Sequence, residues 1–473
     1  MKKIKTFLYI FISVPVLLST LSCKDPILYH ISEEIPLKDP MIEGSPTNFI
    51  MFDNILYVAT GKTIFAYNGA GTAPDPLWPM DEPGKWRKRY VKTNPFSNYN
   101  IIQLAETSSR VYALCYRDTD NTTSRKIIYA DSTQGINDGS WYELTGITKG
   151  TTGDYNIIHS IYTANDNLYI GVQYSGGKPK DPKKERDRTN EYDVLVLNAD
   201  NTTFTRLLPP DGPAPDDNET TIYYKDGAVL YGVAYNGKTF LCTGKGIFLV
   251  NDAGDASSEL REKKEENGVL VNDLTGSFSM NFVGIITLPD NSIAAIRRNG
   301  TLYEADTVGL IKRLNFTDNQ TKAALKEKRW ATGAMAICSE NYKEELEMPL
   351  SKRKILLVGR RDIDTSTTTG YTFGYLELEL NNDGSIKGNP EPDGSIKDNR
   401  FNQPGEPNKG SYTSVVSDAA SSYASSIGVI SIKYIIQAPN GFLFASTQFS
   451  GVWSYKFRKD GKKHMHMWNA EEK

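Results

Sequence analysis

The stretch Asn54-Ile-Leu-Tyr-Val-Ala-Thr-Gly61, followed at once by Thr63-Ile-Phe-Ala-Tyr67, decides the fold of this chain. Each half is a short apolar run, and a glycine turn separates the two. Short apolar runs bounded by turn residues predict buried β-strands joined in a hairpin. The same unit, with its second strand ending near Tyr or Phe, is repeated along the chain.

Six further copies of this unit follow. Three are clear, at 238–250, 291–303 and 440–455, and three weaker copies begin at Arg110, Asn167 and Lys354. An apolar strand is predicted before most copies, at 49–52, 101–104, 157–162, 282–288, 335–338 and 432–437. A more polar strand is predicted after several, at 86–91, 140–144, 204–208, 310–314 and 464–468.

Four strands per copy, apolar within and polar at the outer edge, are typical of a propeller blade, whose inner strands pack between neighbouring sheets. The sequence therefore predicts an all-β fold, a β-propeller of about seven four-stranded blades with short helical and loop insertions. Two β-sandwiches are the alternative, because they also contain many short strands with turns between them.

Four segments interrupt the blade rhythm. Residues 256–267 and 317–329 have a helix-forming composition, and Asp318 is placed to cap the second. Residues 176–190 are charged, and 381–411 contain four prolines, so both are predicted to be loops outside the core. Loops on one face of a rigid scaffold would form a binding surface. The other interpretation is that they are tolerated solvent-exposed insertions.

The N-terminus has the layout of an export signal. Lys2, Lys3 and Lys5 precede a mostly apolar run at 7–18, which is too short to span a membrane comfortably. Small and polar residues then lead to Cys23. We expect a signal peptide at 1–22, a lipidated Cys23 with a tether to residue 45, and the propeller domain at 46–473.

Thr20-Leu-Ser-Cys23 resembles the lipobox of bacterial lipoproteins, with Thr20 where leucine is usual. In that family the signal is cut before the cysteine, which is then acylated. Together with the blades, this motif resembles bacterial envelope lipoproteins that carry a β-propeller domain, including those of outer-membrane assembly. The resemblance implies export, a palmitate-type membrane anchor at Cys23, and a body at the outer membrane that faces the periplasm or the surface. The alternative is an ordinary secretory signal beside a coincidental cysteine.

The charge balance narrows the choice of partners. The chain has 57 acidic against 54 basic residues, and losing the three signal lysines makes it more negative. This argues against nucleic acid as a partner held by bulk electrostatics. Three further cysteines, Cys115, Cys242 and Cys338, lie in apolar runs and are predicted to be buried thiols.

No catalytic motif stands out. The sequence lacks Gly-x-Ser-x-Gly, His-Glu-x-x-His and a phosphate-binding glycine loop. His464 and His466 would share one face of a strand and are weak metal candidates, since two ligands are too few for a closed site. We expect no cofactor, apart from loose calcium binding at two incomplete acidic loops: Asp118, Asp120 and Asn121, and Asp216, Asp217 and Glu219.

Two functions follow from these observations. The first is a non-catalytic envelope scaffold that binds a protein or another ligand. The second is a glycan-binding or glycan-hydrolysing propeller, which would need paired carboxylates that the sequence does not itself pair. Enzyme activity is left open, and the absence of a motif favours a protein that is not an enzyme. The segments 127–131 and 138–142 resemble an Asp-box hairpin without its spacing, and we expect only a strand, a turn and a strand there.

Overall fold

A computed structural model of the full chain provides the fold. It describes residues 41–69, 86–117, 125–147, 155–174, 191–198, 201–207, 229–243, 246–254, 257–260, 263–266, 269–272, 282–290, 292–297, 302–305, 311–316, 335–338, 355–359, 375–380, 383–386, 395–396, 401–402, 432–439, 442–449, 451–456 and 467–470. All of these residues belong to one compact unit, residues 40–471.

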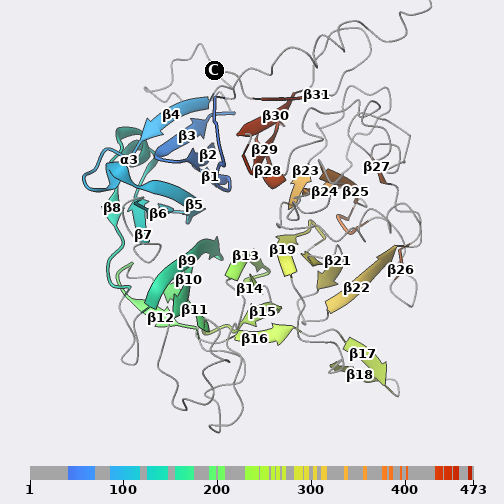
Figure 1. Cartoon of the computed structure of the whole chain (residues 1–473). Coiled ribbons are helices and arrows are strands. Elements are labelled where there is room, and N and C mark those ends of the chain that lie inside the picture. The colour runs from blue at the N-terminus through green and yellow to red at the C-terminus, as the bar shows by residue number, and fades with distance from the viewer. Residues whose placement is uncertain are drawn as a thin grey trace, which may run out of the picture. The chain divides into compact units, whose positions relative to one another are not determined.

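The described residues form seven mainly antiparallel sheets of four or five strands and one two-stranded sheet. The seven larger sheets follow one another along the chain from blue to red in Figure 1. The first three contain β1 Ile50–Phe52, β2 Ile55–Thr60, β3 Thr63–Tyr67 and β4 Trp86–Tyr90; β5 Asn100–Glu106, β6 Val111–Tyr116, β7 Lys126–Ala130 and β8 Tyr142–Glu143; and β9 Tyr155–Ala164, β10 Asn167–Tyr174, β11 Glu191–Leu197 and β12 Phe204–Arg206.

The other four sheets contain β13 Val229–Tyr235, β14 Lys238–Thr243, β15 Ile247–Val250 and β16 Ser257–Leu260; β19 Phe282–Thr287, β20 Ile293–Arg297, β21 Leu302–Ala305 and β22 Ile311–Phe316; β23 Met335–Cys338, β24 Ile355–Gly359, β25 Tyr375–Glu379 and β27 Phe401–Asn402; and β28 Ile432–Gln437, β29 Leu443–Thr447, β30 Val452–Lys456 and β31 Met467–Ala470. A parallel strand, β26 Ser395–Ile396, extends the sheet of β22. β17 Lys263–Glu266 and β18 Val269–Asn272 form a separate hairpin.

Successive sheets contact each other through their first strands. β5 contacts β1 and β9, β13 contacts β9 and β19, and β23 contacts β19 and β28. This order, with four strands in each sheet, confirms the predicted β-propeller of seven blades.

Alternate residues of a central strand face two different neighbouring sheets, since strand side chains alternate between faces. In β6, Val111, Ala113 and Cys115 pack against the first sheet, whereas Tyr112 and Leu114 pack against the third. Both faces are therefore apolar, which explains the continuous apolar runs in the sequence. The outer strand β4 instead exposes alternate residues, with Trp86 buried and Tyr90 half exposed.

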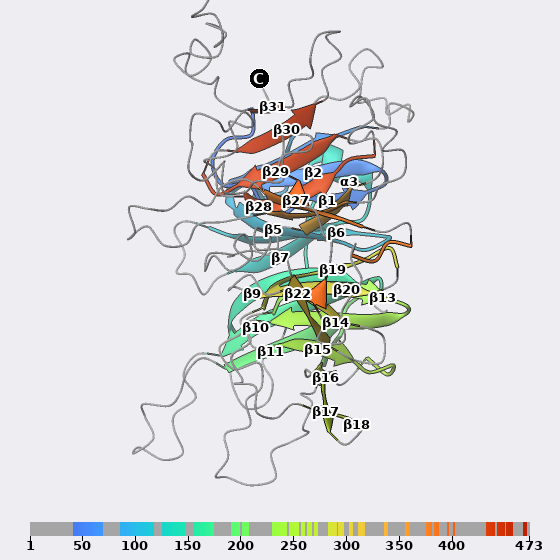
Figure 2. The same cartoon turned by 90° about the vertical axis from the view of Figure 1, so that its right-hand side faces the viewer.

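The last sheet packs on the first, as both views show (Figures 1 and 2). The ring of Phe444 in β29 lies edge-on to Tyr67 and Trp86, with centroid distances of 4.7 and 5.1 Å. The backbone N–H of Val452 donates to the carbonyl of Ile42 at 3.1 Å, next to a second such bond from Gly451 to Gly44. Residues 41–45, which we expected in the tether, thus include backbone groups bonded to the last sheet.

Several expected elements differ from the structure. Residues 256–267, predicted to be helical, contain strands β16 and β17. Pairing of β16 with β15 and of β17 with β18 outweighs the local helix preference of this segment. Residues 381–411, predicted to be a loop, supply β26 and β27, the latter as the outer strand of the sixth sheet. A short helix, α3 Thr133–Asp138, lies between β7 and β8 where we expected only a turn. The segments 176–190 and 317–329 lie outside the described residues.

Phe444→Ala should lower the free energy of unfolding by about 3–5 kcal/mol, because it leaves a cavity where the first and last sheets meet. Phe449→Ala is the matched control, since the Phe449 side chain is 76% exposed, and it should change stability by less than about 0.5 kcal/mol. Urea denaturation of both variants measures this. Equal effects would contradict the packing described for Phe444.

Candidate functional site

The hairpin turns between the first two strands of neighbouring sheets lie together and form what we call the inner-turn face. The turns of the first, third and fourth sheets are Asp53–Asn54, Asn165–Asp166 and Asn236–Gly237, each with two residues at positive φ. Asn, Asp and Gly tolerate this conformation, which tight two-residue hairpins require. The second sheet has a longer turn, Thr107–Arg110.

Side chains of these turns bind neighbouring sheets. Asp166 accepts the backbone N–H of Ser108 at 2.5 Å and its hydroxyl at 2.7 Å. Asn165 donates to the carbonyl of Gly237 at 2.9 Å. The carboxylate of Asp53 accepts the hydroxyl of Thr133 at 2.5 Å. The turns of the first four sheets are therefore fixed to their neighbours by hydrogen bonds.

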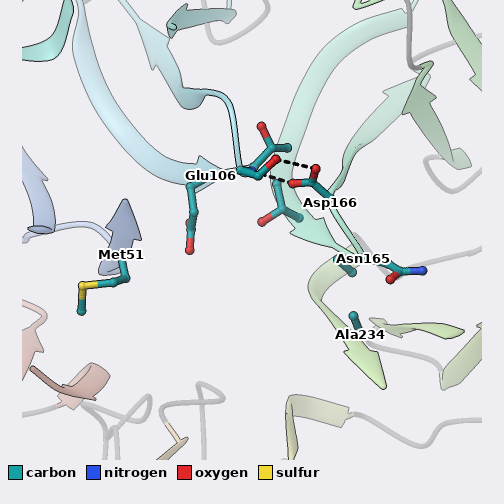
Figure 3. Close-up of a pocket in the computed structure, with 9 residues that line it drawn as sticks. Met51, Glu106, Asn165, Asp166 and Ala234 are labelled. Atoms are coloured by element: carbon teal, nitrogen blue, oxygen red, sulfur yellow. Dashed lines mark hydrogen bonds between the residues drawn. The ribbon is translucent and has the colours of Figure 1, made fainter. Parts of the chain in front are cut away.

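A pocket of about 340 Å³ opens on this face (Figure 3). Four sheets supply its lining, from the ends of β1, β5, β9 and β13 and from the turns that follow β5 and β9: Met51, Glu106, Thr107, Ser108, Thr163, Ala164, Asn165, Asp166 and Ala234. Hydroxyl, amide and carboxyl groups predominate, and neither basic nor aromatic residues are among these nine.

Glu106 is the unusual group in the pocket. Burial raises the pKa of its carboxyl to about 7, and hydrogen bonds with the backbone of Met51 and of Glu106 itself oppose that rise. The carboxyl is therefore poised between its protonated and ionised forms near neutral pH. Figure 3 shows it pointing into the open space between Met51 and Ala234.

The two carboxyl groups of the pocket differ in their surroundings. Two carboxyl groups, those of Glu106 and Asp166, line the pocket, but both oxygens of Asp166 already accept hydrogen bonds from Ser108. Within the described ranges, no group of three or more His, Cys, Asp or Glu side chains could hold a metal ion. The lining offers neither the arginines nor the aromatic wall that we would expect of a glycan-directed enzyme.

None of the nine described lining residues is a site residue predicted from the sequence. Cys23, His464 and His466 fall outside the described residues, as do both candidate calcium loops. Cys115 and Cys242 are fully buried, as predicted, and burial raises the pKa of both thiols, to about 12 for Cys115. The side chain of Cys338 is outside the described part. Among the described helices, none is long and apolar enough to cross a membrane.

Sequence reasoning missed the pocket and Glu106. The available signal was weak: an acidic residue at the end of an inner strand, directly before the polar turn Thr107–Arg110. Many carboxylates in this chain lie beside turns. Glu106 is distinguished from them only by the folded structure, in which the strand ends of four sheets form a pocket around it.

Comparisons with known proteins assign this chain to no family. No protein-family model and no curated protein matches this chain. Its structure is similar to virginiamycin B lyase from Staphylococcus aureus, with 10% identity, a TM-score of 0.43 and 88% and 96% of the two chains covered. It is also similar to a GH74 enzyme from Niastella koreensis, with 11% identity, a TM-score of 0.48, and 92% of this chain and 56% of that enzyme covered. A third similar structure is YCF48 from Cyanidioschyzon merolae, with 10% identity, a TM-score of 0.43 and 88% and 96% of the two chains covered. The alignment thus spans little more than half of the GH74 enzyme.

Glu106→Gln should stabilise the protein above neutral pH and leave it unchanged near pH 4. The pKa of Glu106 is about 7 in the fold against 4.5 ordinarily, so the folded state holds the proton more tightly. Wild-type stability should therefore fall as pH rises from 4.5 through 7, by at most roughly 3 kcal/mol. Urea titrations at pH 4, 6 and 8 measure the difference between the two proteins.

Glu143→Gln is the matched control, because Glu143 lies in the same sheet but pairs with Lys126 at 2.9 Å near the surface. Unlike Glu106→Gln, Glu143→Gln should not stabilise the protein increasingly as pH rises. It should change the free energy of unfolding by no more than about 1 kcal/mol. A Glu106→Gln effect that is the same at all three pH values would contradict the assignment.

Proposed function

We propose that this chain is a non-catalytic, lipid-anchored scaffold of the bacterial envelope, and that it binds a partner protein at the pocket of the inner-turn face. The observation that carries the proposal is the pocket itself, which four sheets line with hydrogen-bonding groups and without a paired catalytic set. Concave sites with a few convergent polar groups are the usual places for ligand binding.

The rigidity of this face supports binding. Hydrogen bonds fix the turn residues Asp53, Asn165 and Asp166 to neighbouring sheets. In the same sheets, the side-chain amide of Asn48 accepts the backbone N–H of Leu104 and donates to its carbonyl. The side-chain carbonyl of Gln103 accepts the backbone N–H of Ile161. A pre-ordered surface loses little conformational freedom when a partner binds, which favours affinity.

The proposed anchor rests on the sequence. The lipobox-like Thr20-Leu-Ser-Cys23 after a short apolar run supports acylation at Cys23 and export to the envelope, with the outer membrane as the proposed location. Several acyl chains on one residue would hold a protein at a membrane far more firmly than one chain. Residues 24–40 would then separate the anchor from the first described residue.

A glycan-hydrolysing propeller is the second candidate, because two carboxyl groups line one pocket and one of them has a raised pKa. Glycosidases use such a pair as acid and as nucleophile or base. We favour the binding function over glycan hydrolysis, because both oxygens of Asp166 already accept hydrogen bonds from Ser108. Release of reducing sugar from envelope polysaccharide by the wild type, and not by Glu106→Gln, would favour the second candidate instead.

A photo-crosslinking amino acid at position 163 should capture a reproducible envelope protein in intact cells, because Thr163 lines the pocket. The matched control is position 88, since Lys88 is an exposed residue of the outer strand β4. Adducts resolved by gel and mass spectrometry should appear for 163 and be at least several-fold weaker for 88. Adducts at 88 alone, or at neither position, would count against the proposed binding face.

Cys23→Ser should abolish incorporation of an alkyne-tagged fatty acid and release the protein from the membrane fraction. Cys115→Ser is the control, because Cys115 is buried between the first two sheets and should not be acylated. In-gel fluorescence after click labelling gives the readout. Persistent labelling of Cys23→Ser would exclude this residue as the anchor.

A further inference from the structure

The pocket presents negative charge and hydrogen-bond acceptors to whatever enters it. Asp166 is held by two hydrogen bonds from Ser108, so Glu106 is the carboxyl group that faces the space (Figure 3). No basic residue is among the nine that line the pocket. A carboxylate attracts a cation more strongly at such a partly buried place than in open water.

The volume of the pocket and its other lining residues restrict the kind of side chain that can bind. A volume of about 340 Å³ is at the lower end for ligand pockets and suits one long side chain. Met51, Ala164 and Ala234 offer apolar contacts, and the hydroxyl of Thr163 offers an acceptor. The hydroxyl of Thr107 already bonds the backbone of Arg110. A lysine side chain combines these needs, with an apolar stem and a compact ammonium that has three donors.

We propose that the pocket takes a lysine side chain of the partner protein, with its ammonium at Glu106 and its stem against Met51 and Ala234. This inference rests on the proposed partner-binding function and adds the chemistry of the recognised residue. Arginine fits less well, because its planar head is best matched by a carboxylate free to bond it bidentately. Here the Glu106 carboxyl also bonds backbone groups.

Binding should strengthen as pH rises, because the ammonium pairs with the ionised carboxyl and the pKa of Glu106 is about 7. Other titratable groups stand on the elements that pack against β5 and in the turns beside it: Tyr57 on β2, Tyr112, Cys115 and Tyr116 on β6, His159 and Tyr162 on β9, and Asp53, Arg110 and Asp166 in the turns. Of these, Asp166 lines the pocket, and both of its carboxylate oxygens accept hydrogen bonds from Ser108.

The test uses the full-length chain, purified in detergent, with ¹³C-labelled methionine methyl groups. Met51 lines the pocket, and its signal is assigned by its loss in Met51→Leu. The probes are Nα-acetyl-lysine methylamide and Nα-acetyl-norleucine methylamide, which share a stem and differ in the ammonium. At pH 8 the lysine probe should shift the Met51 signal and the norleucine probe should not.

A change of pH and a pair of variants test whether the charge of Glu106 is the one that binds the lysine probe. Affinity for the lysine probe should fall about tenfold between pH 8 and pH 6, following the ionised fraction of Glu106. Glu106→Gln should weaken it at least about tenfold at pH 8, while Glu143→Gln should leave it unchanged. Equal shifts by both probes, no shift at Met51, or full affinity in Glu106→Gln would overturn the proposal.

The two proposals can fail separately. Crosslinks from position 163 without a lysine-dependent shift at Met51 would leave the binding face standing and refute lysine recognition. A lysine-dependent shift without any crosslinked partner would refute the proposed partner-binding function and support the chemistry of the pocket.

Discussion

Apolar side chains on both faces of every central sheet require each sheet to have two neighbours. β6 shows this directly, because its odd residues pack on the first sheet and its even residues on the third. A chain of such sheets would leave an apolar face at each end. The contact of Phe444 with Tyr67 and Trp86 covers those two faces, which would otherwise be exposed to water.

Closure also determines where polar groups can gather. The first strands of successive sheets contact each other, so their hairpin turns come together on one face. Positive-φ turns hold Asp53, Asn165 and Asp166 in place, and their side chains bond neighbouring sheets. The pocket thus forms through the same packing of sheets that buries the core. The hydrogen bonds between the turns and neighbouring sheets keep its lining in place.

Glu106 is the group for which stability and the proposed function conflict. A protonated carboxyl is favoured at this half-buried position, and its ionisation at neutral pH opposes folding. A lysine ammonium would supply the counter-charge that the lining lacks. The destabilising charge in the free protein would then contribute to binding in the complex.

The blades could be predicted from the amino-acid sequence alone. Seven apolar hairpins, each bounded by turn residues, predicted the strands from β2 to β30, since burial between two sheets leaves a local record in apolar runs. The buried state of Cys115 and Cys242 followed from the same runs. Outer strands left a weaker record: β16 looked helical and β27 looked like a loop, because an edge strand is held by backbone pairing to its neighbour.

The candidate site could not be predicted from the sequence, because it forms between sheets. Met51, Glu106, Thr163 and Ala234 come from four sheets and span almost 200 residues of sequence, so no local spacing relates them. The raised pKa of Glu106 likewise depends on desolvation by neighbouring strands, which no single strand can provide. Short-range periodicity encodes strands because they are local, whereas a pocket between sheets exists only after the sheets have packed.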